Sequence, residues 1–135
     1  MNERPELTRN QTLVLSKLEG QEGPLSAYQL LDLLRDDGFR APLQVYRALD
    51  KLMRAGLVHR LESLNAFVAC SGHAHAHAGD VTAFAICDQC GQVIELSDRL
   101  VSERLDEWVS KTGFKPTGAV LEFRGACAAC QARAA

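Results

Sequence analysis

The sequence predicts an α+β protein in which a helical amino-terminal part precedes a small β-β-α-β part, and three observations lead to this prediction. Three amphipathic helical segments come first and run into an apolar hairpin pattern. A Gly- and His-rich stretch at residues 71–80 then shows no core periodicity. Two Cys-x-x-Cys motifs follow among strand and helix patterns. We therefore expect domains at residues 1–70 and 81–135, joined by a hinge and metal-binding loop at residues 71–80.

Capping signals predict the first two helices. Thr8 and Gln11 have the spacing of a capping box, and the apolar pattern that follows them stops at Gly20. Ser26 and Gln29 repeat the same spacing at the start of the second helix. The second helix, which ends at Gly38, is expected to bury three leucines: Leu30, Leu33 and Leu34.

The third helix and the hairpin complete the amino-terminal part. Pro42 suits the first helical position, and Gly56 ends the pattern. The apolar face of this helix consists of Val45, Leu49, Leu52 and Met53. Residues 57–70 then give two short apolar runs around a polar turn near Ser63 and Asn65. Three helices followed by a hairpin predict a winged helix-turn-helix.

The carboxy-terminal part is expected to be a dimerisation unit. Strands are predicted at residues 82–86, 92–96 and 119–123, with a helix over residues 97–113 that Ser97 caps and Gly113 ends. The helix places four apolar residues on one face: Val101, Leu105, Trp108 and Val109. About 55 residues form a small core, so the unit is expected to need a metal ion or a partner subunit.

Composition excludes several classes of protein. The chain of 135 residues is 47% hydrophobic, which is typical of a folded globular protein. It has no apolar run of the roughly 20 residues that a membrane helix needs, and its amino terminus is polar, so we expect a cytoplasmic protein without a membrane partner. Five cysteines, an odd number, argue against a disulfide framework and for metal or thiol chemistry.

Cys87, Cys90, Cys127 and Cys130 form two Cys-x-x-Cys motifs that are predicted to bind a structural zinc ion. Tetrahedral zinc accepts four thiolates, and each two-residue gap lets one turn supply two ligands. Redox use is the competing interpretation, and it would place one motif at a helix start. A zinc deaminase, the enzymatic alternative, needs a His-x-Glu motif and an open ligand position, which this pattern lacks. We expect a protein that is not an enzyme.

A second set of potential ligands surrounds the 71–80 stretch. Before it, His59 lies in the first strand of the predicted hairpin and Cys70 ends that hairpin. Three histidines lie within it (His73, His75 and His77), and Glu95 follows the first cysteine motif. Sulfur, imidazole and carboxylate together suit Zn²⁺ better than Mg²⁺ or Mn²⁺. Plainer interpretations stay open: Cys70 as a small buried residue, His59 as a solvent-facing strand residue, and the histidines as an unspecific metal scavenger.

Positive charge is concentrated in one segment although the net charge of the chain is −2. Residues 39–60 contain one acid, Asp50, and five basic residues: Arg40, Arg47, Lys51, Arg54 and Arg60. Tyr46 and Arg47 lie early in the third helix and away from its apolar face, as a recognition helix in the DNA major groove requires. A solvated basic face, or a tyrosine packed on a neighbouring helix, is the alternative.

The chain resembles the ferric uptake regulator superfamily of metal-dependent repressors over nearly its whole length. The segments that carry the resemblance are "LSAYQLLDLLR", "VYRALDKLMRAGLVHRLES", "ICDQCGQVIEL" and "GACAAC", in family order. Within the superfamily it is most similar to the zinc-uptake-regulator branch, because a "VHR.ES" hairpin ends in a cysteine at Cys70. The iron and peroxide sensors of the superfamily tend to use only nitrogen and oxygen ligands at their sensory sites.

The resemblance implies residue roles. It implies structural zinc at the four motif cysteines and regulatory zinc at His59, Cys70, His77 and Glu95, hence two ions per chain. His75 and Asp80 remain alternatives for the third regulatory ligand, because the loop has an unusual length. It also implies base contacts by Tyr46 and Arg47, and we expect the basic residues Arg40 and Lys51 to contact DNA as well.

The expected function is that of a homodimeric, zinc-responsive repressor, which binds a palindromic double-stranded operator and controls zinc-uptake genes. No small molecule other than the metal ion is expected to bind. An iron- or peroxide-responsive repressor of the same superfamily is the alternative. A zinc storage protein would not need the helix-turn-helix.

Overall fold

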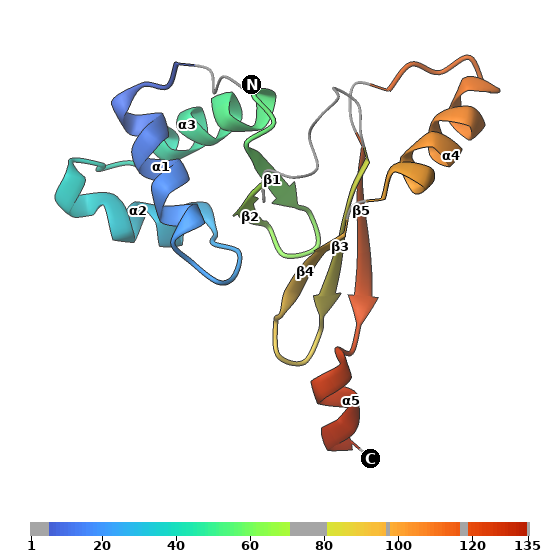
Figure 1. The fold of residues 1–135 in the computed structure, drawn as a ribbon. Coiled ribbons are helices and arrows are strands. Elements are labelled where there is room, and N and C mark those ends of the chain that lie inside the picture. The colour runs from blue at the N-terminus through green and yellow to red at the C-terminus, as the bar shows by residue number, and fades with distance from the viewer. Residues whose placement is uncertain (1–5, 71–80, 97, 117–118, 135) are drawn as a thin grey trace. The chain divides into compact units, whose positions relative to one another are not determined.

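A computed structural model describes residues 6–70, 81–96, 98–116 and 119–134. The chain divides into two compact units, Met1–Cys70 and Ser71–Ala135. Figure 1 shows the helices and the hairpin of the first unit and the sheet of the second. The predicted loop at residues 71–80, with its three histidines and Asp80, lies outside the described residues.

The first unit contains three α-helices, a 3-10 turn and a hairpin. They are α1 (Arg9–Glu19), α2 (Ala27–Leu34), η1 (Arg35–Asp37), α3 (Pro42–Arg54), β1 (Val58–Leu61) and β2 (Ala66–Ala69). Both predicted capping boxes are present, since the side chains of Thr8 and Ser26 accept from the backbone N–H groups of Gln11 and Gln29. Pro42 occupies the first turn of α3 as predicted. These local signals therefore set where the helices begin.

The hairpin adds the wing. β1 and β2 pair antiparallel, with His59 opposite Val68. Asn65 closes the turn with a φ of 48°, a left-handed conformation that asparagine tolerates. A bridge between Leu25 and Phe67 ties the segment before α2 to the edge of β2. The predicted winged helix is confirmed.

One apolar cluster holds the first unit together. α1 packs against α2 and α3, and the side chains of Leu30, Leu34 and Leu49 are fully buried at the centre. The prediction that Leu33 is buried is wrong: it is 41% exposed, and Leu31 is buried instead. The buried side of α2 is the side that contacts α1 and α3, and two pairs of leucines around Asp32 do not reveal which side that is.

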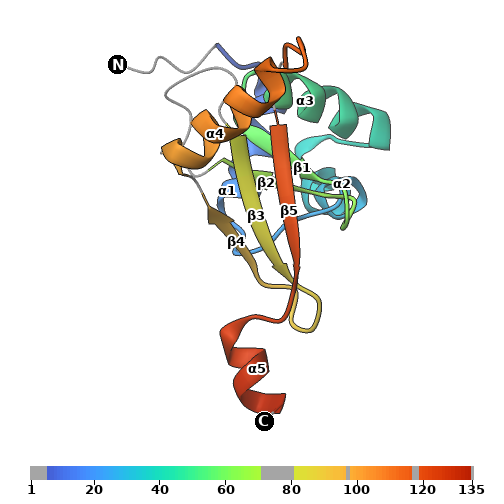
Figure 2. The same ribbon diagram turned by 90° about the vertical axis from the view of Figure 1, so that its right-hand side faces the viewer.

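The second unit is a three-stranded sheet with two helices: β3 (Val81–Cys87), β4 (Val93–Leu96), α4 (Arg99–Ser110), β5 (Ala119–Gly125) and α5 (Ala128–Ala134). The strand order is β4-β3-β5. β3 pairs antiparallel with β4 and parallel with β5, in a register that places Val81 opposite Ala119 and Cys87 opposite Gly125. Figure 2 shows β3 and β5 side by side along their length, with α5 beyond their ends.

Two details of the second unit differ from the prediction. Asp98, not Ser97, caps α4: its carboxylate accepts from the backbone N–H groups of Leu100 and Val101. The second cysteine motif was expected in a turn after a strand, but Cys130 lies inside the short helix α5. Alanine, glutamine and arginine are strong helix formers, and they make up most of residues 128–134.

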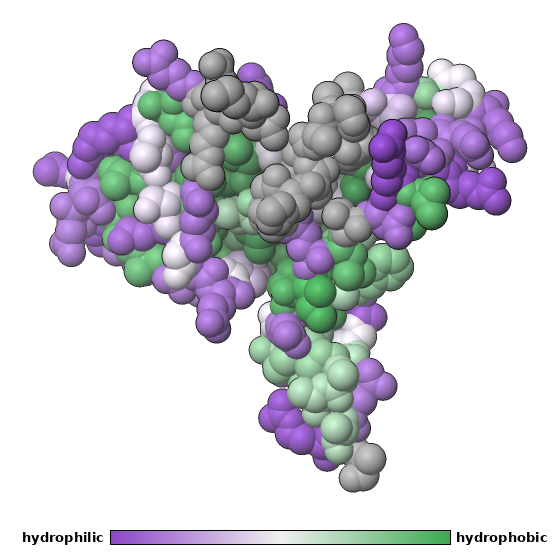
Figure 3. Space-filling model, in the orientation of Figure 1, coloured by the Kyte–Doolittle hydropathy of each residue, from purple (hydrophilic) through white to green (hydrophobic). Residues whose placement is uncertain are grey.

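Apolar side chains of the second unit stay at its surface. On α4 only Ser102 is buried, where its hydroxyl accepts from the backbone N–H of Val81, while Trp108 is 69% exposed. Ile94 and Phe123, on the two outer strands, flank the same position of β3 and are also exposed. Figure 3 shows green, apolar surface over these strands. No helix in the described ranges is long and apolar enough to cross a bilayer.

Candidate metal centre and nucleic-acid interface

The four motif cysteines gather at one end of the sheet. Cys87 is the last residue of β3, and Cys90 lies in the turn that leads to β4. Because β5 runs parallel to β3 and Gly125 lies opposite Cys87, the residues after β5 return to the same end of the sheet. Cys127 precedes α5, and Cys130 sits in its first turn. The parallel strand pair therefore brings together two motifs that are 36 residues apart.

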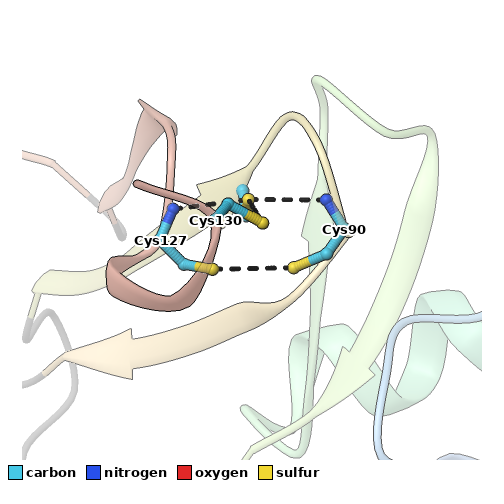
Figure 4. Close-up of side chains that lie close together, drawn as sticks. Cys90, Cys127 and Cys130 are labelled. Atoms are coloured by element: carbon cyan, nitrogen blue, oxygen red, sulfur yellow. Dashed lines mark hydrogen bonds between the residues drawn. The ribbon is translucent and has the colours of Figure 1, made fainter. Parts of the chain in front are cut away.

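The geometry of the cluster fits a tetrahedral zinc ion. The four sulfur atoms all lie within 4.8 Å of one another. The Sγ atoms of Cys87 and Cys130 are 3.7 Å apart, and those of Cys90 and Cys127 are also 3.7 Å apart (Figure 4). Four sulfurs at about 2.3 Å from a zinc ion would be separated by about 3.8 Å. All four cysteines are free, and a disulfide would need about 2.05 Å.

The surroundings of Cys87 favour its deprotonated, thiolate form. The backbone N–H of Cys90, at 3.5 Å, and that of Cys127, at 3.4 Å, both donate to its sulfur. These hydrogen bonds lower the pKa of Cys87 to about 6, although burial opposes the shift. A thiolate is the form that binds a metal, so Cys87 offers a preformed ligand at neutral pH.

In the second motif the pKa of one thiol is lowered and the pKa of the other is raised. The backbone N–H of Cys130 lowers the pKa of Cys127. The pKa of Cys130 is raised to about 12, because its thiol donates to Cys127 and is buried. A thiol that is still protonated must lose its proton when it binds a metal ion.

One feature of the structure fits a redox role for the cysteine motifs, and another argues against it. The second motif does begin a helix, as that role requires. However, its two sulfurs belong to a group of four that spans both motifs. A closed set of four thiolates is typical of structural zinc and leaves no open position for catalysis.

Three polar side chains that support the cluster were not among the predicted site residues. Arg124 forms an ion pair with Asp88 at 3.2 Å and so connects β5 to the first motif. Gln131 donates to the backbone carbonyl of Ala126 at 2.8 Å, and Arg133 lies 3.9 Å from the sulfur of Cys130. Arg133 could have been found, because residues three apart share a helical face.

The predicted regulatory set is distributed over both units. His59 lies half-buried on β1, and Cys70 follows β2, where its backbone N–H donates to Leu57. Glu95 lies half-buried on β4 of the second unit, and His77 is outside the described residues. Within the described parts of the chain, the only gathered group of three or more ligand-type side chains is the four-cysteine cluster.

The predicted DNA-contacting residues lie on the exposed side of α3 and just before it. Tyr46 is 41% exposed, and Arg47 and Lys51 are exposed. The latter two line an open groove with Thr8, Asn10 and Gln11 from the start of α1. The backbone N–H of Arg40 donates to the side chain of Gln44 at 2.7 Å, which holds the exposed Arg40 beside the helix start. Tyr46 is thus partly exposed on α3.

Not every basic residue of this region is available to a ligand. Arg54 forms an ion pair with Asp50 at 3.3 Å, and Arg60 on the wing contacts Asn65 and Glu62. The groove contains two cations, Arg47 and Lys51, and one acid, Asp50, whose charge Arg54 offsets. This exposed basic face of a winged helix is what groove binding requires.

Known proteins with similar sequences are named as regulators of zinc or iron uptake. The model of the Ferric uptake regulator family matches residues 7–124. The Zinc uptake regulation protein of Escherichia coli (strain K12) is 42% identical over 125 residues, which cover 92% of this chain and 72% of that protein. The protein of the same name from Shigella flexneri has the same identity and coverage.

Two solved structures share both sequence and fold. The crystal structure of holo XcZur is 44% identical, with a TM-score of 0.80 over 94% of this chain and 87% of that one. A zinc uptake regulator in complex with zinc and DNA is 39% identical, with a TM-score of 0.82 over 96% of this chain and 87% of that one. On the family match and these identities, the chain belongs to the ferric uptake regulator family.

Proposed function

We propose that this protein is a zinc-activated transcriptional repressor that binds DNA as a homodimer. The observation that carries the proposal is the exposed Tyr46–Arg47–Lys51 face of α3, in a chain that also gathers four thiols in zinc geometry. The relatives named for zinc uptake, and the similar structure that contains zinc and DNA, support it. Such a protein acts in the cytoplasm, catalyses no reaction, and has zinc-uptake genes as its targets.

The structural zinc ion is held by Cys87, Cys90, Cys127 and Cys130. It cross-links the end of β3 to the start of α5 and so stabilises the small sheet of the second unit. Cys87 would supply a thiolate at neutral pH, and Cys130 would have to lose its proton to bind the ion.

The regulatory ion is held by His59, Cys70, His77 and Glu95, which brings the number of zinc ions to two per chain. Ligands from both units make this ion sensitive to how the units are arranged. Zinc can act as a switch only through different affinities for two arrangements. The thiolate of Cys70 favours zinc over the harder ions that an iron- or manganese-responsive relative would use.

DNA recognition is assigned to α3 and its flank. Arg47 can donate two hydrogen bonds to guanine, and Tyr46 can contact a thymine methyl group or the sugar-phosphate backbone. Arg40 and Lys51 neutralise phosphates. In a two-fold dimer the two recognition helices meet half-sites about 34 Å apart, so the operator is a palindrome. Linkage requires that DNA tighten zinc binding by the factor with which zinc tightens DNA binding.

The decisive experiment replaces the one cysteine outside the cluster. Cys70→Ser should leave folding and the dimer intact but reduce the zinc content from two ions per chain to one and abolish zinc-dependent operator binding. Metal analysis and gel-shift titration with increasing zinc measure the two effects. An unchanged zinc response in the gel shift would refute the regulatory role of Cys70, and a wild-type response to Fe²⁺ in place of zinc would favour the iron-sensing alternative.

A second experiment separates base contacts from phosphate contacts. Arg47→Ala should cost about 1–3 kcal/mol of operator binding and relax specificity at one base position. Lys51→Ala is the matched variant, because it lines the same groove and should weaken binding equally for all sequences while reducing the salt dependence. If Arg47→Ala instead weakens all sequences alike, Arg47 is a phosphate contact.

A further inference from the structure

Arg133 lies close to the four-cysteine cluster without being one of its ligands. It follows Cys130 by three residues on α5, so its side chain lies on the same helical face. Its Nη2 is 3.9 Å from the Sγ of Cys130, and its Nε is 3.5 Å from the backbone carbonyl of Ala129. These contacts place a guanidinium group against a ligand sulfur.

The contact between Arg133 and Cys130 places a positive charge beside a cluster that would be negatively charged. Four thiolates around one Zn²⁺ ion leave a net charge of about two negative units, and neighbouring donors determine how well that charge is tolerated. Cys87 receives backbone N–H groups from Cys90 and Cys127. Cys130 is buried, and Arg133 is the positively charged side chain that donates to its sulfur.

The other nearby arginine is already paired. Arg124 contacts the carboxylate of Asp88 at 3.2 Å, so a neighbouring acid offsets its charge. Among the residues that the structure describes, Arg133 forms no ion pair with a carboxylate. Arg133 is exposed, and its hydrogen bonds within the described part of the chain go to the carbonyl of Ala129 and to the sulfur of Cys130.

We propose that Arg133 is a positioning residue of the zinc centre: its guanidinium group donates to the Cys130 thiolate, offsets the charge of the cluster and slows the release of zinc. This inference rests on the proposed structural zinc ion. It assigns to one helix residue, which is not a ligand, an influence on the rate at which zinc is released.

The test compares zinc release from three variants of the full-length, zinc-loaded protein. Arg133→Gln removes the charge, Arg133→Lys retains it, and Arg104→Gln removes an exposed arginine of α4 that pairs with Glu107 at 3.4 Å. Release is followed with an excess of a chromogenic chelator. We expect Arg133→Gln to release its most tightly held ion about three- to tenfold faster, with Arg133→Lys close to wild type and Arg104→Gln unchanged.

A spectroscopic measurement excludes a merely structural effect. With Co²⁺ in place of zinc, loss of a charged donor makes the thiolate easier to oxidise, so the sulfur-to-cobalt charge-transfer band of Arg133→Gln should move to longer wavelength. Equal release rates for all variants, or equal acceleration in Arg133→Gln and Arg133→Lys, would overturn the inference. Its failure is distinguishable from failure of the proposed function, because metal analysis of Cys70→Ser, which lacks a ligand of the proposed regulatory site, shows whether the cluster holds zinc.

Discussion

The two units of this protein are stabilised in different ways. The first unit buries a continuous cluster that includes Leu30, Leu34, Leu49 and Phe39, contributed by all of its α-helices and the segment between α2 and α3. The second unit buries few side chains apart from those of β3, and its other two strands and α4 expose Ile94, Trp108 and Phe123. Two of its buried apolar residues are the cysteines Cys87 and Cys130.

The difference shows how each unit compensates for small size. A unit of about 60 residues is only marginally able to stabilise itself by burial of apolar surface. The first unit succeeds because three helices and a wing enclose one core. The second unit has one sheet with an uncovered apolar face, so we infer that cross-linking at one end and association with a second copy supply what its core lacks.

Removal of the metal should have the largest effect, and only on the second unit. Structural zinc sites contribute about 10–16 kcal/mol of binding free energy, which here is folding free energy. We expect Cys87→Ser, or exhaustive chelation of wild-type protein, to abolish protection of β3, β4 and β5 in amide hydrogen exchange while α1–α3 stay protected. Cys70→Ser is the control and should retain protection everywhere. If the second unit remains protected without metal, it does not differ from the first unit in needing a metal ion.

A cavity in the first core should have an intermediate effect, confined to the first unit. Leu49 is fully buried, and truncation of a buried leucine costs about 2–5 kcal/mol. Leu49→Ala should therefore lower the melting temperature of the first unit without changing the zinc content. Leu33→Ala, at a position that is 41% exposed, is the matched control and should change stability by less than about 0.5 kcal/mol. Equal losses from the two leucines would contradict the assignment of the core.

Loss of an exposed aromatic residue from the sheet should have the smallest effect. Phe123 on β5 is 57% exposed, and we expect it to be covered by a second copy of the chain. Phe123→Ala should weaken dimerisation by about 1–3 kcal/mol, measured by sedimentation, with no loss of secondary structure. Tyr28→Ala removes an aromatic residue that is 64% exposed on α2 and should leave the dimer unchanged. The reverse result would assign association to the first unit.

Local signals in the sequence predicted most of the fold. Thr8, Ser26 and Pro42 act on the backbone within a few residues, so the starts of the first three helices could be predicted from short segments. The same reasoning failed at Ser97, because Asp98 beside it is an equally good cap and the choice depends on the path of the chain out of β4. The helix at residues 128–134 was missed because the cysteines were interpreted as a turn.

Non-local features of the site were harder to predict. The spacing of Cys87 and Cys90 indicates a metal ligand pair, but only the parallel register of β3 and β5 explains how Cys127 and Cys130 reach it. That register depends on contacts between residues more than 35 positions apart, which no short pattern encodes. The proposed regulatory set, His59, Cys70, His77 and Glu95, stays a prediction for the same reason.

The register between β3 and β5 also has an evolutionary consequence. Because paired strand ends, rather than chain length, bring Cys87 near Cys127, the connecting segment from β4 through α4 is not constrained in length by the metal site. The metal site itself should therefore tolerate insertions and deletions in the loops between the two motifs, whereas either two-residue gap should tolerate none.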